Sequence, residues 1–234
     1  MNALAAKLAG KFIVLDGPDG SGKSTQIALL RDHLAGVGLT VELVYDPGAT
    51  EVGEKIRAIL LGKDTARIGA TCEMLRFMAA RAQLVEERVR PALSAGKVVL
   101  CDRFISSTLA YQGASGLDPI IILDVGETAV QGIWPDLTVI LDVPVEVTRQ
   151  RLGDRGAPVI RRKVVEGSDP QLALFGDRVE SRSDDFHESV RRNFRRLVKD
   201  FPHPAVCIRA DRPREEVFQD VLESLVRTFC AGRE

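Results

Sequence analysis

A glycine-rich stretch near the start of the chain carries residue types that bind phosphate. Residues 17–24 read GPDGSGKS and match the pattern G-x-x-x-x-G-K-[ST] in full. Glycines let the backbone curl so that its N–H groups point inward at phosphate oxygens. Lys23 can then reach the β- and γ-phosphates of a nucleotide, and the Ser24 hydroxyl can bind Mg²⁺.

The context of this stretch fits the same chemistry, because an apolar strand precedes it and a helix, whose N-terminus favours an anion, follows it. A chance glycine-rich turn is the alternative interpretation. We predict a site for a nucleoside triphosphate, with the ATP-binding residues Gly17, Pro18, Asp19, Gly20, Ser21, Gly22, Lys23, Ser24 and Thr25. GTPases, motors, transporters and small-molecule kinases share such a loop, so the motif leaves the reaction open.

Two charged residues follow a later apolar run, residues 97–101. Ligands bind at the carboxyl ends of strands in open α/β sheets. Asp102 can hold Mg²⁺ there, directly or through water, and Arg103 can bind a second phosphate through two hydrogen bonds. An exposed ion pair between the two is the alternative.

The predicted helix 71–94 carries two stripes of side chains. Phe77 and Arg81 are four residues apart, which brings them together on one face, where they could stack on a base and hydrogen-bond its edge. The alternative, an ordinary boundary Phe beside a solvated Arg, is favoured by this helix taken alone. The core-facing stripe is predicted to be Met74, Met78, Val85 and Val89.

A basic segment follows the fourth apolar run. Its cations are Arg149, Arg151, Arg155, Arg161, Arg162 and Lys163, against Asp154 alone. Such a lid could stabilise the charge of a moving phosphoryl group. The alternatives are a solvated loop and a nucleic-acid patch, but no aromatic residues are interleaved for base stacking.

The elements that position these residues follow from alternating apolar runs and helical patterns. The runs predict strands at 12–16, 40–45, 97–101, 137–143 and 205–208, buried on both faces. Helices are predicted at 23–36, 51–62, 71–94, 104–113, 118–131, 144–152, 181–200 and 213–229. This alternation predicts a single α/β domain over 1–234: a five-stranded parallel sheet flanked by helices in a P-loop NTPase fold. Residues 149–180, rich in Gly, Pro and charge, are predicted to form a mobile basic lid.

Composition and net charge restrict the classes of binding partner and the compartment that we expect for this chain. The 234 residues carry a formal net charge of −1, which does not predict bulk binding to nucleic acid or to an anionic membrane. No apolar run has transmembrane length, and the N-terminus does not resemble a signal peptide. The four cysteines show no metal-binding spacing. We expect reduced thiols, mostly in the core, in a cytoplasmic protein.

The chain resembles the thymidylate kinase family over almost its whole length. Besides the phosphate loop, four stretches are similar to family motifs, in order and at matching spacing: DRF with S and AYQ at 102–112, LRFMAARAQLVEE at 75–87, PDLTVILDVPVEV at 135–147 and DRVESRSDDFHESVRRNF at 177–194. The resemblance implies Mg²⁺-dependent phosphorylation of dTMP by ATP. It also implies a homodimer, in which helices such as 71–94 could form the contact.

The resemblance further implies roles for single residues. Phe77 would stack on the thymine ring, and Arg81 would bond its edge near Thr108 and Gln112. The remaining implied roles are Arg103 on the dTMP phosphate with Ser107 beside it, Tyr111 against the sugar 2′ position, Asp19 near the 3′-hydroxyl and the acceptor phosphate, and Asp102 organising Mg²⁺.

The catalytic arginines are expected in the lid. Family members differ in whether an arginine lies in the phosphate loop, and here Gly20 follows Asp19. Arg151 and Arg155 match the lid positions and are predicted to clamp the transition state. With them, the predicted catalytic set is Lys23, Asp19, Asp102 and Arg103.

One stretch departs from the family pattern. Residues 45–50 read YDPGAT where the family usually has REPGGT, so Asp46, assigned to acceptor binding, is shorter than Glu, and Tyr45 replaces a cation. Two alternatives therefore stay open: a kinase for another pyrimidine nucleotide, and a nucleotide-binding protein without turnover.

Overall fold

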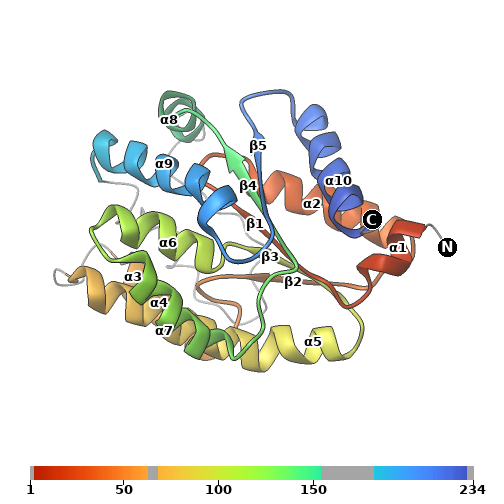
Figure 1. Ribbon diagram of the computed structural model, residues 1–234, viewed down its shortest axis with the longest axis horizontal. Helices are drawn as coiled ribbons and strands as arrows, with labels where there is room; N and C mark the ends of the chain where they lie inside the picture. The colour runs from red at the N-terminus through yellow and green to blue at the C-terminus, as the bar shows by residue number, and fades with distance from the viewer. Residues whose placement is uncertain (1–2, 63–67, 154–181, 231–234) are drawn as a thin grey trace.

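The computed structural model describes residues 3–62, 68–153 and 182–230. Its centre is a five-stranded parallel sheet in the order β2–β3–β1–β4–β5 (Figure 1). The strands are β1 (Phe12–Asp16), β2 (Val41–Tyr45), β3 (Val98–Asp102), β4 (Leu137–Asp142) and β5 (Ala205–Arg209). The predicted α/β class and the five-stranded parallel sheet are confirmed.

Helices connect the strands within the described residues. They are α1 (Ala3–Leu8), α2 (Lys23–Gly36), α3 (Glu51–Leu61), α4 (Ala70–Leu84), α5 (Arg90–Ser94), α6 (Ile105–Ala114), α7 (Pro119–Val130), α8 (Val145–Gly153), α9 (Asp184–Asp200) and α10 (Arg214–Cys230). The sequence analysis missed α1, which packs on α10 near the other end of the chain (Figure 1). None of these helices is both long and apolar enough to cross a membrane.

The predicted helix 71–94 is a continuous helical run with one wide turn. The π-helical turn η1 (Val85–Val89) joins α4 to α5. Pro91 lies in the first turn of α5 and has no N–H to donate back to the preceding turn, which accounts for the change in hydrogen-bonding pattern there. The predicted core stripe is confirmed, because Met74, Met78, Val85 and Val89 are all buried.

Helices cover both faces of the sheet (Figure 1). One face packs against α1, α2 and α10, where Leu30 and Leu34 meet Val221 and Leu225. The other packs against the helices from α4 to α7 and α9, where apolar side chains such as Met78 and Phe194 are buried. The three central strands are therefore covered on both sides.

Two sequence expectations about burial are wrong. The strands β2 and β5 are not buried on both faces, because they are the edge strands and several of their side chains reach solvent. The cysteines are not mostly in the core: Cys101 is buried on central β3, whereas Cys72, Cys207 and Cys230 are exposed. Apolar runs in the sequence identify strands, but they do not show which strands lie at the edges of the sheet.

The topology brings the predicted site residues to one edge of the sheet. The loop after β1, the loop after β3 and the start of α8 after β4 all lie at the carboxyl ends of adjacent parallel strands. The predicted lid begins inside α8, so residues 149–153 are helical. Its remainder, 154–180, lies outside the described residues.

Candidate active site

The phosphate loop is held close to the strand beside it. Gly17 adopts a φ of 135°, and a Cβ there would lie 2.5 Å from the carbonyl oxygen of Leu141 on β4. Gly20 adopts a φ of 76° and approaches the backbone of Thr148 on α8 in the same way. Both positions therefore favour glycine, because each combines a positive φ with a close approach of neighbouring backbone.

Lys23 points back into this loop from the first turn of α2. Its Nζ donates hydrogen bonds to the carbonyl oxygens of Gly17 and Pro18, at 3.0 and 2.8 Å. Burial, with the nearby charge of Arg103, lowers the pKa of Lys23 to about 8. The ammonium group is thus a poorly solvated cation in the loop, and a bound phosphate would stabilise it.

Arg103 joins the loop to the strand β3. Its Nη1 donates to the carbonyl oxygen of Gly17 at 3.0 Å, and its Nη2 donates to Asp19 Oδ1 at 2.5 Å. Burial would raise the pKa of Asp19, but the charges of Arg103 and Lys23 outweigh it and lower that pKa to about 2. Asp19 is therefore a negative charge held between the cationic groups of Arg103 and Lys23.

The backbone of Arg103 is strained. Its φ of 72° is in the left-handed region, which residues with a side chain rarely adopt. The guanidinium points to the phosphate loop, where it bonds Gly17 and Asp19. Such strain is found mostly where a functional geometry requires it.

A buried carboxylate that the sequence analysis missed organises the same corner. Asp16, the last residue of β1, is fully buried and accepts hydrogen bonds from the hydroxyls of Ser106 and Ser107 at 2.5 and 2.7 Å. Ser107 also accepts from Arg103 Nη1 at 3.0 Å. The signal was its place at the carboxyl end of the central strand, directly before the glycine loop.

The predicted base-binding residues lie around a second buried cation. Arg81 is 1% exposed, and its Nε donates to Asp46 Oδ2 at 2.5 Å. Its Nη2 donates to Thr108 Oγ1 at 3.0 Å and to the carbonyl oxygen of Phe104. The interpretation of Arg81 as a solvated surface residue is therefore wrong. Burial raises the pKa of Asp46, and the guanidinium opposes that rise.

The helix α6 connects the phosphate corner to this second group. Ser107 and Tyr111 face the loop: the Tyr111 hydroxyl donates to Asp19 at 3.3 Å, and its ring lies 5.4 Å from the guanidinium of Arg103. Thr108 and Gln112, each one residue further, face α4. Phe77 is partly exposed on α4, about one helical turn before Arg81. One helix thus aligns both predicted halves of an acceptor site.

The unusual segment 45–50 makes contacts of its own. The Tyr45 hydroxyl donates to Glu54 Oε1 at 2.5 Å, and the same oxygen accepts from the backbone N–H of Ala49. Arg57 on α3 lies 5.7 Å from the Tyr45 ring and donates to the carbonyl oxygen of Pro47 at 2.8 Å. A cation therefore lies beside this segment although residue 45 is not an arginine.

The remaining predicted residues lie at the rim of the loop. Arg151 on α8 donates to the carbonyl oxygen of Gly20 at 3.3 Å, so one expected lid arginine lies next to the phosphate loop. Arg155 lies outside the described residues. Ser24 and Thr25 are exposed at the start of α2, and Asp102 ends β3 as a buried carboxylate whose charge acts on Lys23.

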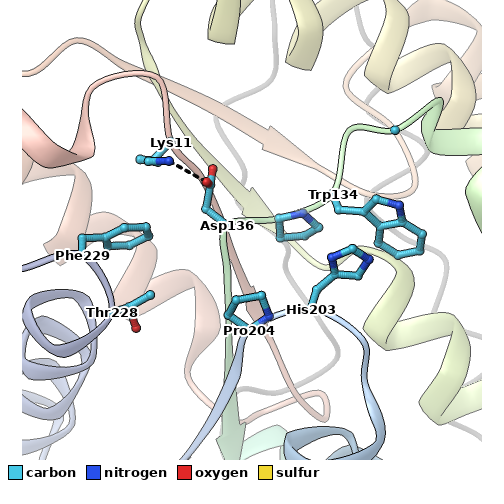
Figure 2. Close-up of a pocket in the computed structure, with 9 residues that line it drawn as sticks. Lys11, Trp134, Asp136, His203, Pro204, Thr228 and Phe229 are labelled. Atoms are coloured by element: carbon cyan, nitrogen blue, oxygen red, sulfur yellow. Dashed lines mark hydrogen bonds and ion pairs between the residues drawn. The ribbon is translucent and has the colours of Figure 1, made fainter. Parts of the chain in front are cut away.

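A hollow of about 480 Å³ lies elsewhere, at the amino ends of the strands (Figure 2). Its walls include Trp134, stacked on His203 at 4.2 Å, and a 2.8 Å ion pair between Lys11 and Asp136. Asp136 also accepts the backbone N–H of Phe12. No predicted site residue lines it, and the ion pair ties β1 to the turn before β4.

Comparison with known proteins agrees with this geometry. The family model described as thymidylate kinase matches residues 15–221. Thymidylate kinase of an Exiguobacterium species is 40% identical over 96% of this chain and 98% of its own, and that of Desulfovibrio desulfuricans is 41% identical over 88% and 90%. The crystal structure of thymidylate kinase from Ehrlichia chaffeensis matches with a TM-score of 0.67 and 28% identity, covering 92% of this chain and 98% of that one. A P-loop kinase fold, a phosphate loop with its lysine and a family match over most of the length lead to one conclusion: this chain belongs to the thymidylate kinase family.

Proposed function

We propose that the chain transfers the γ-phosphoryl group of ATP to the 5′-phosphate of dTMP. An oxygen of the dTMP phosphate attacks the γ-phosphorus, the bond from that phosphorus to the β–γ bridging oxygen breaks, and ADP leaves with the electron pair. The acceptor is already an ionised phosphate, so a strong general base is not required. Positioning and charge stabilisation supply the catalysis.

The observation that carries this proposal is the meeting of Lys23, Asp19 and Arg103 at one corner. Lys23 Nζ bonds a carbonyl oxygen of the phosphate loop, and Arg103 bonds both that loop and Ser107 on α6. We assign Lys23 to the donor and Arg103 to the acceptor phosphate. Arg151, beside Gly20, is assigned to the charge that develops on the moving group, as is Arg155 by family resemblance.

The acceptor base is assigned to the second group of residues. Phe77 offers a partly exposed ring on α4, while Arg81, Thr108 and Gln112 supply polar atoms at its side. Asp46 holds Arg81 in place at 2.5 Å, which supports an indirect role for Asp46 in acceptor binding. Tyr111, fixed by Asp19, is assigned to the sugar as a wall against a 2′-hydroxyl.

The residues present fit a magnesium ion. A serine hydroxyl at Ser24 and a carboxylate at Asp102 are the oxygen donors that Mg²⁺ prefers, with phosphates and water completing the shell. Across the described ranges, no group of three or more acidic, His or Cys side chains could hold a metal. When bound, the ion neutralises charge on the β- and γ-phosphates.

A coupled assay of ADP release, with ATP, Mg²⁺ and dTMP, tests the proposal. We expect turnover that needs dTMP and that Lys23→Ala or Arg103→Ala removes. Binding of ATP without turnover, with any nucleoside monophosphate added, would instead make the chain a nucleotide-binding protein of another kind. Conversely, release of ADP without an acceptor would indicate an ATPase.

A homodimer is a further part of the proposal. Exposed apolar side chains lie on α4 and on the two helices that pack against it: Leu75 on α4, Val52 and Ile59 on α3, and Ile120 and Ile121 on α7. Contiguous exposed apolar patches mark protein–protein contacts, and we propose that these side chains form such a patch. Sedimentation should give a particle mass of twice the 25.6 kDa of one chain. Leu75→Glu should reduce it to the mass of a single chain. Val226→Glu on α10 is the control, because Val226 is similarly exposed on the other side of the sheet.

The location expected from sequence, the cytoplasm, stays part of the proposal. All four cysteines are free, and three of them are exposed. Exposed, unpaired thiols persist in a reducing compartment. Fractionation of the source cells, with antibody detection in the cytosolic fraction, tests this part independently of activity.

A further inference from the structure

A second buried ion pair lies beside the residues assigned to the base. Glu73 on α4 is 1% exposed, although it is charged. Arg182 Nη2 donates to both of its carboxylate oxygens, at 3.0 and 2.9 Å. Gln112 Nε2 donates to the same carboxylate at 2.8 Å. A carboxylate this deep is retained only where its partners fix it, and these contacts do so.

The contact with Glu73 determines which way the Gln112 amide faces. An ionised carboxylate can only accept hydrogen bonds, so the amide nitrogen must be the atom that faces it. The amide oxygen then lies on the opposite side, where it accepts no hydrogen bond from the described residues. Gln112 as a whole is only 2% exposed, and its amide oxygen is not among the fully buried polar atoms that lack a partner, so within the described residues it is placed to accept a hydrogen bond from a bound ligand.

The position of that oxygen relative to Arg81 follows from helix geometry. Glu73, Phe77 and Arg81 follow one another at four-residue intervals on α4, and Thr108 and Gln112 do so on α6. Arg81 contacts Thr108 and Glu73 contacts Gln112, so Phe77 lies between these two cross-helix contacts. Arg81 Nη1, which donates to Met78 Sδ, retains one further N–H.

A ring stacked on Phe77 would therefore meet an acceptor from Gln112 and a donor from Arg81. Thymine and uracil present the complement, an N3–H donor beside a C4 carbonyl acceptor. Cytosine presents the reverse, an unprotonated N3 beside an amino group. Cytosine in this place would face an acceptor with an acceptor and a donor with a donor, which leaves buried polar groups without partners. A pocket discriminates strongly against a ligand that does this.

We infer that Glu73 is a positioning residue that sets pyrimidine choice by holding the Gln112 oxygen toward N3 of the acceptor base. The inference rests on the proposed function, because it concerns the base of the same acceptor. Arg182, stacked 4.6 Å from the Phe186 ring and bonded to Ser115, holds the charge of Glu73 in place. Glu73 itself does not touch the substrate.

The test compares kcat/KM for dTMP, dUMP and dCMP under one set of conditions. Glu73→Gln keeps the shape but can donate as well as accept, so the Gln112 amide is free to turn over. We expect the dTMP-to-dCMP ratio to fall by ~10-fold or more. The dTMP-to-dUMP ratio should stay unchanged, because both bases carry N3–H.

Two further variants separate positioning from folding. Arg182→Lys loosens the ion pair but keeps a cation beside Glu73 and the bond from Gln112 to Glu73, so both ratios should stay near those of the wild type even if all rates fall. The exchange Glu73→Gln/Gln112→Glu conserves charge and volume and places an obligate acceptor at position 112. We expect it to restore the dTMP-to-dCMP ratio, and it serves as the test if Glu73→Gln does not fold.

Three results would overturn the inference. They are an equal loss for all three acceptors in Glu73→Gln, the same fall of the dTMP-to-dCMP ratio in Arg182→Lys as in Glu73→Gln, or an exchange variant whose ratio does not recover. A wild-type protein that turns over ATP with none of the acceptors would refute the proposed function itself. The two failures are therefore distinguishable in one set of assays.

Discussion

Replacing the buried Arg81 should separate its structural contribution from its role in base recognition. The guanidinium and the Asp46 carboxylate are each 1% exposed at the side chain and lie 2.5 Å apart. Arg81→Met removes the cation, keeps most of the volume and leaves Asp46 buried without its partner. The double variant Arg81→Met/Asp46→Asn also removes the anion.

The magnitude follows from the cost of an uncompensated buried charge. Breaking a buried pair from one side destabilises a protein by about 3–5 kcal/mol, whereas removing both charges is far less costly. We expect a loss in that range for Arg81→Met and recovery of about half of it in the double variant. Both should lose kcat/KM for dTMP, since neither presents the Arg81 donor to the base.

The pH dependence of the stability loss gives a second check, because its direction can be worked out from the pKa of Asp46. Burial raises the pKa of Asp46 already in the intact protein, and Arg81 opposes this rise. An acid whose pKa is higher in the folded than in the unfolded state destabilises the fold as pH rises through the folded value. The loss caused by Arg81→Met should therefore be larger at pH 8 than at pH 5.

Urea unfolding at both pH values measures these differences through the midpoint and the slope. A loss below about 1 kcal/mol for Arg81→Met, or a double variant less stable than the single one, would refute the reasoning. In that case the pair would behave as a surface contact, contrary to its burial. Activity measured on the same samples shows whether base recognition is lost independently of stability.

Two other predictions concern the phosphate loop. Because the pKa of Lys23 is lowered to about 8, the protein without nucleotide loses this charge as pH rises above 8. The dissociation constant of a non-hydrolysable ATP analogue should then increase up to ~10-fold per pH unit, and Lys23→Ala should abolish that slope in calorimetric titrations. Gly17→Ala places a Cβ 2.5 Å from the Leu141 carbonyl oxygen. It should destabilise by at least ~1–3 kcal/mol in thermal unfolding, and by more than Gly22→Ala, whose Cβ meets nothing within 4 Å despite a positive φ. An affinity for the ATP analogue that does not change with pH would contradict the prediction for Lys23. Equal losses of stability in Gly17→Ala and Gly22→Ala would contradict the prediction for Gly17.

Local signals in the sequence predicted the parts of the site that are contiguous in the chain. The loop at 17–24 was found because its chemistry is contained in eight neighbouring residues. The strands and most helices followed from periodicity, and their bounds differ from the predictions by up to three residues. The family resemblance supplied roles that spacing alone left open, such as the thymine-binding roles of Phe77 and Arg81.

Contacts between distant residues were not predictable in this way. Arg81 is buried because Asp46, 35 positions earlier, neutralises it, and no property of the helix itself shows that partner. Glu73 and Arg182 are 109 positions apart, so their pairing depends on how α9 is placed against α4 and α6. The exposure of Cys207 likewise follows from the position of β5 at the edge of the sheet, which the run itself does not encode.

Transfer of label from γ-labelled ATP tests the central claim most directly. Purified protein would be incubated with Mg²⁺ and dTMP, dUMP, UMP, dCMP or GMP, each separately, and the products separated. We expect label to appear in dTDP, faster than in the product of any of the other four acceptors. This transfer should be lost in Arg103→Ala. Label recovered as inorganic phosphate, on the protein, or mainly in another nucleoside diphosphate would contradict direct transfer to dTMP.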